Sequence, residues 1–379
     1  MAAITRVGSL KKHFRKLKDP RVEGRSKHLL FDVIVMAMCG VIANCDDWPD
    51  IALFAQQREK WFRRFLRLPH GVPAHDTFER VFAALDSAVF ERCCMAWLCD
   101  VADLVGGQIA IDGKTLCGSG NATLAPLHLV SAWATQARLV LGQVPVDAKS
   151  NEITAIPHLL TLLDLKGALV TIDAMGCQKE IARKIVAGGG DYLLVVKGNQ
   201  EGLLTDIQET VGQALDGQLP RRAVAQHTTR EEGHGRAEER ICVVVRDVKR
   251  IRDRKAWPRL KTVGMCCRER TVNGKTSNET VYIISSRRLS ARRCAFALRS
   301  HWGIENNLHW QLDISFREDA SRIENRHGCA NFALLRKLAL CLHQRHPRKD
   351  SIARKRKRAA LDPVFLAETL AGARSLEKI

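Results

Sequence analysis

The chain has 379 residues, which is long enough for two or three domains with cores of their own. A hydrophobic content of 46% and a charged content of 27% are ordinary for a globular protein, so a disordered or fibrous chain is excluded. The formal net charge of +19 is not ordinary. The basic residues are spread along the whole chain, which indicates a polyanionic partner, nucleic acid before membrane.

The start of the chain carries no signal-peptide pattern. The longest apolar run, 33–43, is far shorter than the ~20 residues that span a membrane. We therefore expect a cytoplasmic protein with no membrane partner.

The thirteen cysteines are scattered, and none belongs to a C-x-x-C pair. Adjacent pairs such as Cys93-Cys94 and Cys266-Cys267 have poor geometry for zinc. We interpret the cysteines as small buried hydrophobic residues in a reducing cytosol.

Residues 1–100 are predicted to be helical. An apolar helix is expected over 29–43, and a turn at Asp46-Asp47-Trp48-Pro49 leads into a second helix over 50–66. Apolar residues recur at helical spacing along the second helix, and its other side is basic. A third helix is expected over 76–85. The pattern favours a compact helical module with basic faces.

From residue 107 the pattern changes to short apolar strands that alternate with helices. Strands are expected over 108–112, 128–134, 139–146, 168–173 and 191–197, and helices over 153–165 and 178–187. The second and third strands are separated by a short turn, which suggests a hairpin. The order β-β-β-α-β-α-β predicts an α/β fold with a mixed sheet and helices packed on it.

Residues 200–287 interrupt this pattern, and we interpret them as a β-rich insertion. Strands are expected over 240–248 and 279–285, with a turn at Asn273-Gly274 between them.

The remaining residues are predicted to be helical, followed by a basic tail. One helix begins near 289 and continues through 305, and an apolar helix covers 330–342. The basic run 354–358 is predicted to be a disordered arm that holds nucleic-acid backbone loosely.

Three carboxylates stand out by their position. Asp112 ends the first strand, Asp173 ends the fourth, and Glu305 lies in a helix with apolar neighbours such as Trp302 and Ile304. Each acid alone has an ordinary interpretation: a turn, a helix cap or a solvated residue. Together they predict a cluster, because ligands of open α/β sheets bind beyond the carboxyl ends of the strands.

Gathered carboxylates repel one another, so such a cluster is unfavourable without a cation. Mg²⁺ prefers oxygen ligands, and two such ions ~3.5–4 Å apart can activate a nucleophile and stabilise a leaving oxygen. In a chain with a net charge of +19, the cluster indicates chemistry on nucleic-acid phosphates. Weaker candidates for the same role are Asp313, Glu318, Asp319 and Glu152, of which Glu152 also suits a helix cap.

Four short motifs follow one another in the chain: Ile111-Asp112-Gly113-Lys114, Thr171-Ile172-Asp173-Ala174, Val196-Lys197-Gly198-Asn199-Gln200 and His301-Trp302-Gly303-Ile304-Glu305-Asn306-Asn307-Leu308-His309-Trp310. Together they resemble the ISAs group of H-repeat-associated insertion-sequence transposases. These are DDE transposases with an RNase H-like catalytic core. Each motif is weak alone, and the resemblance of the ordered set extends over residues 10–370.

The resemblance implies an RNase H-like mixed sheet flanked by helices, a β-rich insertion and an N-terminal α-helical domain. The expected domains are 1–100 for DNA binding, 101–199 for the first part of the catalytic core, 200–287 for the insertion, 288–345 for the second part of the core with the glutamate helix, and 346–379 for a basic tail.

The resemblance also implies that Asp112, Asp173 and Glu305 are catalytic ligands of Mg²⁺, for which Mn²⁺ is expected to substitute. The reaction would be nicking of transposon ends and attack of the freed 3′-hydroxyl on target DNA. The partners would be double-stranded DNA, at the ends and at the target, and a second copy of the chain on that DNA. Such a protein would work at the nucleoid of a bacterial cytoplasm.

Phosphate contacts are expected from basic residues near these motifs. Related transposases carry a tyrosine–arginine–glutamate–lysine signature, but this chain has Leu298, His301 and Leu312 where the signature has tyrosine, arginine and lysine. The hypothesised DNA-binding residues are Lys114, Lys197, Arg299, Arg317, Arg322, Arg63, Arg64 and Arg356. For Lys114 and Lys197, an exposed turn lysine is the alternative.

Two other functions stay open on the sequence alone. The chain could be a catalytically inactive DNA-binding relic or regulator, or a metal-dependent nuclease that cuts DNA without joining it. His301 and His309 flank Glu305, but with two tryptophans nearby we interpret them as packing and hydrogen-bonding residues rather than zinc ligands.

Overall fold

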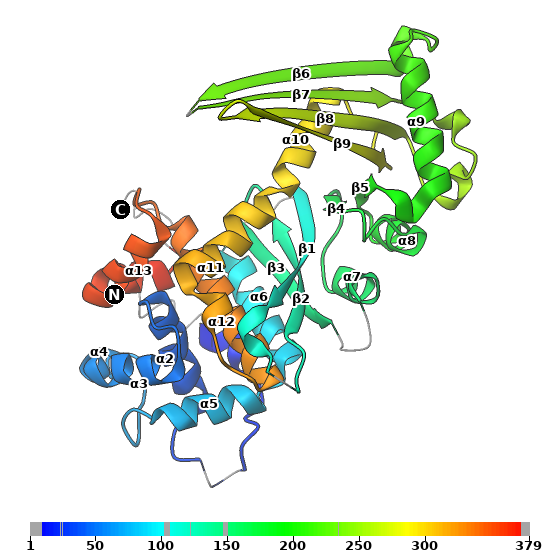
Figure 1. Ribbon diagram of the computed structural model, residues 1–379. Coiled ribbons are helices and arrows are strands. Elements are labelled where there is room, and N and C mark those ends of the chain that lie inside the picture. Colours follow the sequence, from blue (N-terminus) through cyan, green and yellow to red (C-terminus); the bar gives the residue numbers. More distant parts are fainter. Residues whose placement is uncertain are drawn as a thin grey trace, which may run out of the picture.

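The structure, a computed structural model, describes residues 10–22, 24, 26–101, 107–121, 123–146, 151–233 and 235–372. Figure 1 shows a helical base, a central sheet with helices on both faces, and an arm that projects away from the base. The arm consists of the long strands over 224–285, within the predicted insertion. The acids of interest lie in the central part, between the base and the arm.

The base is built from the N-terminal helices α2 (Leu30–Ile42), α3 (Trp48–Gln57), α4 (Glu59–Phe62), α5 (His75–Ala84) and α6 (Ser87–Val101). Helix α2 is buried almost all round, as its apolar sequence predicts. The Asp47 carboxylate caps α3 by accepting a hydrogen bond from the Asp50 N–H at 2.8 Å. The helix expected over 50–66 is broken at Arg58, whose guanidinium donates to the Ala360 carbonyl at 2.8 Å.

The sheet has nine strands, in the spatial order β3-β2-β1-β4-β5-β9-β8-β7-β6. The strands are β1 (Gln108–Leu116), β2 (Leu127–Ala134), β3 (Leu139–Val146), β4 (Leu169–Ile172), β5 (Asp191–Val196), β6 (Val224–Gly233), β7 (Arg236–Val245), β8 (Thr262–Val272) and β9 (Lys275–Ser285). Strand β4 lies parallel to β1 and β5, and the other pairs are antiparallel. The first five strands therefore form the expected RNase H-like mixed sheet.

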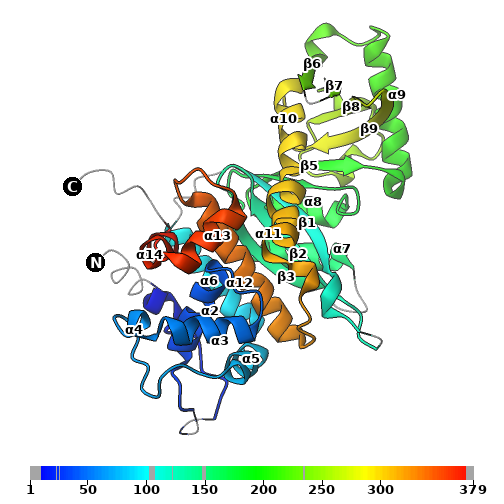
Figure 2. The ribbon, with the colours of Figure 1, turned by 60° about the vertical axis from the view of Figure 1, so that its left-hand side comes forward.

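Helices cover both faces of the sheet. One face carries α7 (Glu152–Thr161), α8 (Lys179–Ala187) and α9 (Glu201–Leu215). The other face carries α10 (Ala291–His301) and α12 (Arg326–Arg345), with α11 (Trp310–Phe316) between them in the chain. Figure 2 shows α10 running from the arm down to α11 and the base. This helix connects the insertion to the segment that contains Glu305.

The insertion extends the central sheet instead of forming a separate one, because β9 pairs with β5. Its four strands include β6 and β8, which sequence analysis did not predict. The hairpin at Asn273-Gly274 is present, and both residues have positive φ (+49° and +74°), as a tight two-residue turn requires.

The N-terminal and C-terminal helices share one hydrophobic core. Helix α12 packs against α2, α5 and α6, and the last two helices, α13 (Ile352–Leu361) and α14 (Pro363–Leu370), pack against α2. The prediction of a disordered basic arm at 354–358 is therefore wrong. That run lies in α13, in which Lys355 and Arg356 are buried and Arg354 and Lys357 are exposed.

Arg356, which was predicted to bind DNA, is instead buried in the base. Its side chain is 1% exposed, and its guanidinium lies 4.1 Å from the Phe316 ring centre. It also forms an ion pair with Asp46 at 2.8 Å and donates to the Val41 carbonyl at 3.3 Å. Arg356 stabilises the base and is not placed to contact DNA.

Among the described helices, none combines the length and the apolar composition that crossing a membrane requires.

We expect Arg356→Ala to lower the free energy of unfolding by about 3 kcal/mol, because it leaves Asp46 and several buried carbonyls without their donor. Lys357→Ala, an exposed position on the same helix, is the matched control and should leave stability unchanged. Urea unfolding measures both. Equal stabilities, with DNA affinity lost only in the Arg356 variant, would contradict this role.

Candidate active site

The register of two neighbouring strands brings the two aspartates together. Strands β1 and β4 run parallel, and their last paired residues are Ile111 and Ile172. Asp112 and Asp173 are the next residue on each strand. Because adjacent strands lie ~4.8 Å apart and side chains alternate between faces, both aspartates leave the sheet on the same side.

That side is the face covered by α10. On β4, Thr171 precedes Asp173 by two residues, and its hydroxyl lies 3.0 Å from Nδ1 of His301 on α10. One detail differs from the prediction: Asp112 does not end its strand. Strand β1 continues to Leu116, paired there with β2 alone. Only the parallel pairing with β4 ends here, at Ile111, one residue before Asp112.

Glu305 begins a π turn that covers residues 305–309. The continuous helix expected through Glu305 is instead α10, a turn near Trp302, the π turn and α11. Ile304 and Leu308 are buried in the core shared with the base, and this leaves Glu305 exposed on the other side. A π turn inserts an extra residue into a helix and is common at functional sites.

The end of α10 is fixed against the sheet by buried hydrogen bonds. The Gln108 amide donates to the Ala297 carbonyl at 2.7 Å and to the Thr171 hydroxyl at 3.1 Å. Burial lowers the pKa of His301 to about 4, so its ring is neutral when it bonds Thr171. His301 is thus a hydrogen-bonding residue, as expected, and it sets the position from which the chain reaches Glu305.

The carboxylates lie close enough to affect one another. Burial, together with the negative charges of Asp173, Glu152 and Glu305, raises the pKa of Asp112 to about 7. Partial burial and Glu152 also raise the pKa of Asp173, whereas Lys197 lowers it. This repulsion is the electrostatic signature of a site that a cation would relieve.

The oxygens of Asp112, Asp173 and Glu305 are not all within 4.8 Å of one another; among the described residues only three cysteines reach that mutual distance. A site for a pair of cations spans a wider space, because the ions themselves lie ~3.5–4 Å apart. The donor set, carboxylate oxygen throughout, fits Mg²⁺ or Mn²⁺.

Glu152, which sequence analysis ranked below the other three acids, is a fourth acid whose charge acts on Asp112 and Asp173. It is the first residue of α7, and its Oε1 lies 2.7 Å from Nε2 of His128 on β2. Both groups occupy the space above Gly113, where an added Cβ would lie 2.1 Å from that Glu152 oxygen. Gly113 therefore permits Glu152 to approach the aspartates.

His309, at the end of the π turn, lies on the other side of Asp112. Its Nδ1 is 3.5 Å from the Asp112 Oδ2. Burial, with the nearby charges of Lys337 and Lys114, lowers the pKa of His309 to about 3. The neutral ring can orient Asp112 without neutralising it.

The competing acids beyond the glutamate helix have another role. Asp313, Asp319 and Glu318 form ion pairs with the Lys114 ammonium at 2.6, 3.0 and 3.3 Å. The Lys114 side chain is only 12% exposed. Lys114 therefore links β1 to the segment after α11, and its predicted phosphate contact is not supported.

Lys197 lies at the edge of the site. It follows β5, is exposed, and its charge acts on Asp173. The two residues after Gly198 hold the loop beyond Asp173. The Asn199 side-chain amide donates to the Ala174 carbonyl at 2.8 Å, and the Gln200 side-chain amide donates to the Cys177 carbonyl at 3.1 Å. The motif that begins at Val196 thus packs directly on the motif that contains Asp173.

The predicted DNA-binding arginines are not gathered at the acids. Arg299 forms an ion pair with Glu231 of the arm. Arg63 forms an ion pair with Glu59 on the base at 2.6 Å. The remaining ones, Arg64, Arg317 and Arg322, are exposed.

Comparison with known proteins agrees with this geometry. Residues 106–342 match the family model described as "Transposase DDE domain", and residues 11–98 match the model described as "DDE_Tnp_1-associated". The chain belongs to the DDE transposase family. The match over 106–342 begins just before β1, ends within α12, and includes Asp112, Asp173 and Glu305.

Relatives of this chain match over nearly their full length. A candidate transposase of Escherichia coli, YncI, is 38% identical over 98% of this chain and 96% of its own. YhhI of the same species, named as an H repeat-associated candidate transposase, is 36% identical over 96% of this chain and 98% of its own. Among solved structures, a piggyBac transposase synaptic complex with hairpin DNA overlays with a TM-score of 0.43 and 11% identity, covering 98% of this chain and 80% of that one.

The raised pKa of Asp112 has a consequence for stability. A carboxyl whose pKa rises on folding costs no stability below its unfolded pKa, and the cost develops as the pH rises to the folded value, about 7. We expect Asp112→Asn to stabilise the metal-free protein at pH 8 by on the order of 2 kcal/mol, and by less at pH 5.

Urea unfolding in EDTA at the two pH values tests this expectation. Asp216→Asn, an exposed position at the end of α9, is the control. Equal stability of Asp112→Asn and the parent protein at pH 8 would show that folding does not raise the pKa of Asp112.

Proposed function

We propose that this chain is a DNA transposase that uses Asp112, Asp173 and Glu305 to hold divalent cations, nicks the ends of its element and joins the freed 3′-hydroxyl to target DNA. The observation that carries the proposal is the shared register of β1 and β4, which brings two aspartates side by side, with the charge of Glu305 acting on Asp112. Membership of the DDE transposase family supports the same reaction class.

The donor set supports Mg²⁺, with Mn²⁺ as a substitute, because each proposed ligand is a carboxylate. When bound, a pair of such ions supplies an activated nucleophile and a stabilised leaving oxygen for displacement at phosphorus. The protein supplies the positions: Asp112 from β1, Asp173 from β4, and Glu305 from the helical segment tied to the sheet through His301.

Neighbouring residues complete the site in this proposal. His309 orients Asp112 through Nδ1, and the contact between His128 and Glu152 holds a further carboxylate beside the two aspartates. Lys197, exposed beside Asp173, is the basic residue best placed to contact a DNA phosphate.

The partner in this proposal is double-stranded DNA, bound by two copies of the chain so that both ends are processed together. A net charge of +19 supports binding through phosphates, and affinity should fall steeply as salt rises. We assign end recognition to residues 1–100, catalysis to 101–199 with 288–345, and support of the glutamate segment to the insertion at 200–287.

Labelled DNA carrying the terminal sequences of the element, incubated with the protein and Mg²⁺, should give nicked and joined products. We expect Asp112→Asn, Asp173→Asn and Glu305→Gln each to reduce both products by about 10³-fold or more while DNA binding is kept. Asp216→Asn is the control and should react like the parent protein.

The other outcomes separate the alternatives. Binding without any cutting by the parent protein would favour an inactive regulator or relic. Cutting without joining would favour a nuclease. Full joining by a variant that lacks one of the three acids would exclude that acid from the site.

A further inference from the structure

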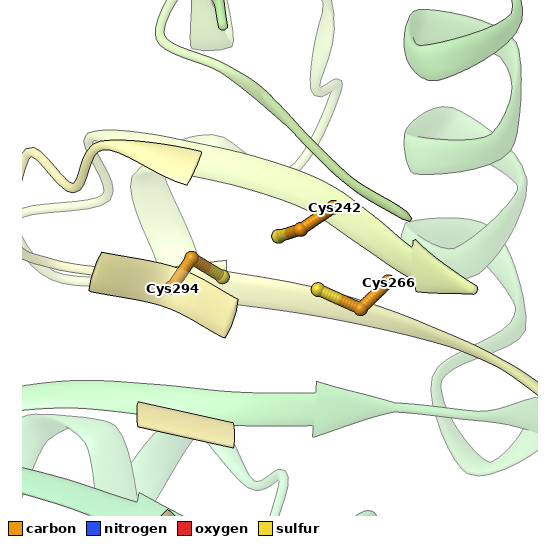
Figure 3. A group of neighbouring side chains, drawn as sticks. All are labelled: Cys242, Cys266 and Cys294. Atoms are coloured by element: carbon orange, nitrogen blue, oxygen red, sulfur yellow. The ribbon is translucent and has the colours of Figure 1, made fainter. Parts of the chain in front are cut away.

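Three cysteines from distant parts of the chain meet where helix α10 packs on the arm. The sulfurs of Cys242, Cys266 and Cys294 all lie within 4.8 Å of one another, as Figure 3 shows. They come from β7, β8 and α10. Cys242 and Cys294 are buried, and Cys266 is partly buried.

The strand register explains the convergence and adds a fourth residue. Cys242 is paired directly with Cys266 on β8 and with His227 on β6, so the three side chains form a row across one face of the sheet. Ala225, two residues before His227, packs on the same hydrophobic cluster as Cys242 and Cys294. His227 therefore faces the side that α10 covers.

We propose that Cys242, Cys266, Cys294 and His227 bind one zinc ion that joins the arm to helix α10. Three thiolates and one imidazole are a ligand set of structural zinc sites. At a Zn–S distance of about 2.3 Å, tetrahedral geometry places the sulfurs about 3.8 Å apart, so the sulfur spacing needs only a small contraction. His227 does not lie within 4.8 Å of all three sulfurs, and its side chain has to turn toward them to complete the site. Mg²⁺, which prefers oxygen ligands, would not compete for this site.

The surroundings suit such an ion. A cavity of about 80 Å³ is lined by Cys242 and Cys266 but not by Cys294 or His227, so it lies beside the group of sulfurs and not between them. Zinc with three thiolates and a neutral imidazole has a net charge of −1. Arg240, Arg268 and Arg299 line the same cavity and can balance this charge, although each also contacts a glutamate.

The position gives the ion a structural task. Cys294 lies in the first turn of α10, and the same helix ends at His301, just before the segment that contains Glu305. Zinc would fix the arm to the helix that leads to the proposed catalytic glutamate. The inference rests on the geometry of the cysteines and the register of His227, and it stands whether or not the chain is an active transposase.

Metal analysis of the full-length protein, purified under reducing conditions, tests the proposal. We expect one zinc per chain and, after exchange into Co²⁺, the absorption bands of tetrahedral thiolate coordination. Cys266→Ser and Cys294→Ser should lose the metal. Cys267→Ser is the matched control, because the next residue on β8 points to the opposite face, and it should keep the metal.

His227→Ala should weaken zinc affinity by about ten-fold or more while leaving the buried thiols in place. The His227→Ala variant tests the zinc proposal even if the cysteine variants fail to fold. A parent protein that binds neither zinc nor cobalt through thiolates would overturn the proposal. So would a disulfide within the trio under these conditions, or full metal retention by Cys266→Ser.

Discussion

The parallel pairing of β1 with β4 is the constraint on which the site depends. It ends at Ile111 and Ile172, and so the first residues beyond it, Asp112 and Asp173, lie side by side on one face. The Asp173 carboxylate accepts a hydrogen bond from the Met175 N–H at 3.1 Å and so also shapes the local turn, but burial beside other carboxylates disfavours the charged form of Asp112. The fold therefore maintains an arrangement that is costly by itself, which is typical of functional sites.

The rest of the molecule positions Glu305 close enough for its charge to act on Asp112. Helix α10 is tied to the sheet by Gln108 and His301, and the π turn then directs Glu305 away from the core that Ile304 and Leu308 enter. Helix α12 carries the same core into the N-terminal base, and the arm continues the sheet through β9. Base, sheet and arm thus act as one frame for the acids.

Much of this frame could be predicted from sequence, because the β1–β5 strands are short apolar runs and Asp173 directly follows one of them. Features that depend on distant contacts could not. A basic run such as 354–358 resembles a solvated arm, and only the packing of α13 on the base shows that Arg356 is buried. Strand β6 is polar and half exposed, so its alternation carries no apolar signal. The closeness of Glu152 to the aspartates depends on the missing side chain at Gly113, which spacing alone does not reveal.

Anomalous X-ray scattering from crystals grown with Mn²⁺ and end-containing DNA tests the central claim most directly. The account predicts two manganese peaks ~3.5–4 Å apart, within bonding distance of oxygens from Asp112, Asp173 and Glu305. Manganese bound instead near Asp313 and Asp319, with the strand-end aspartates unliganded, would contradict it.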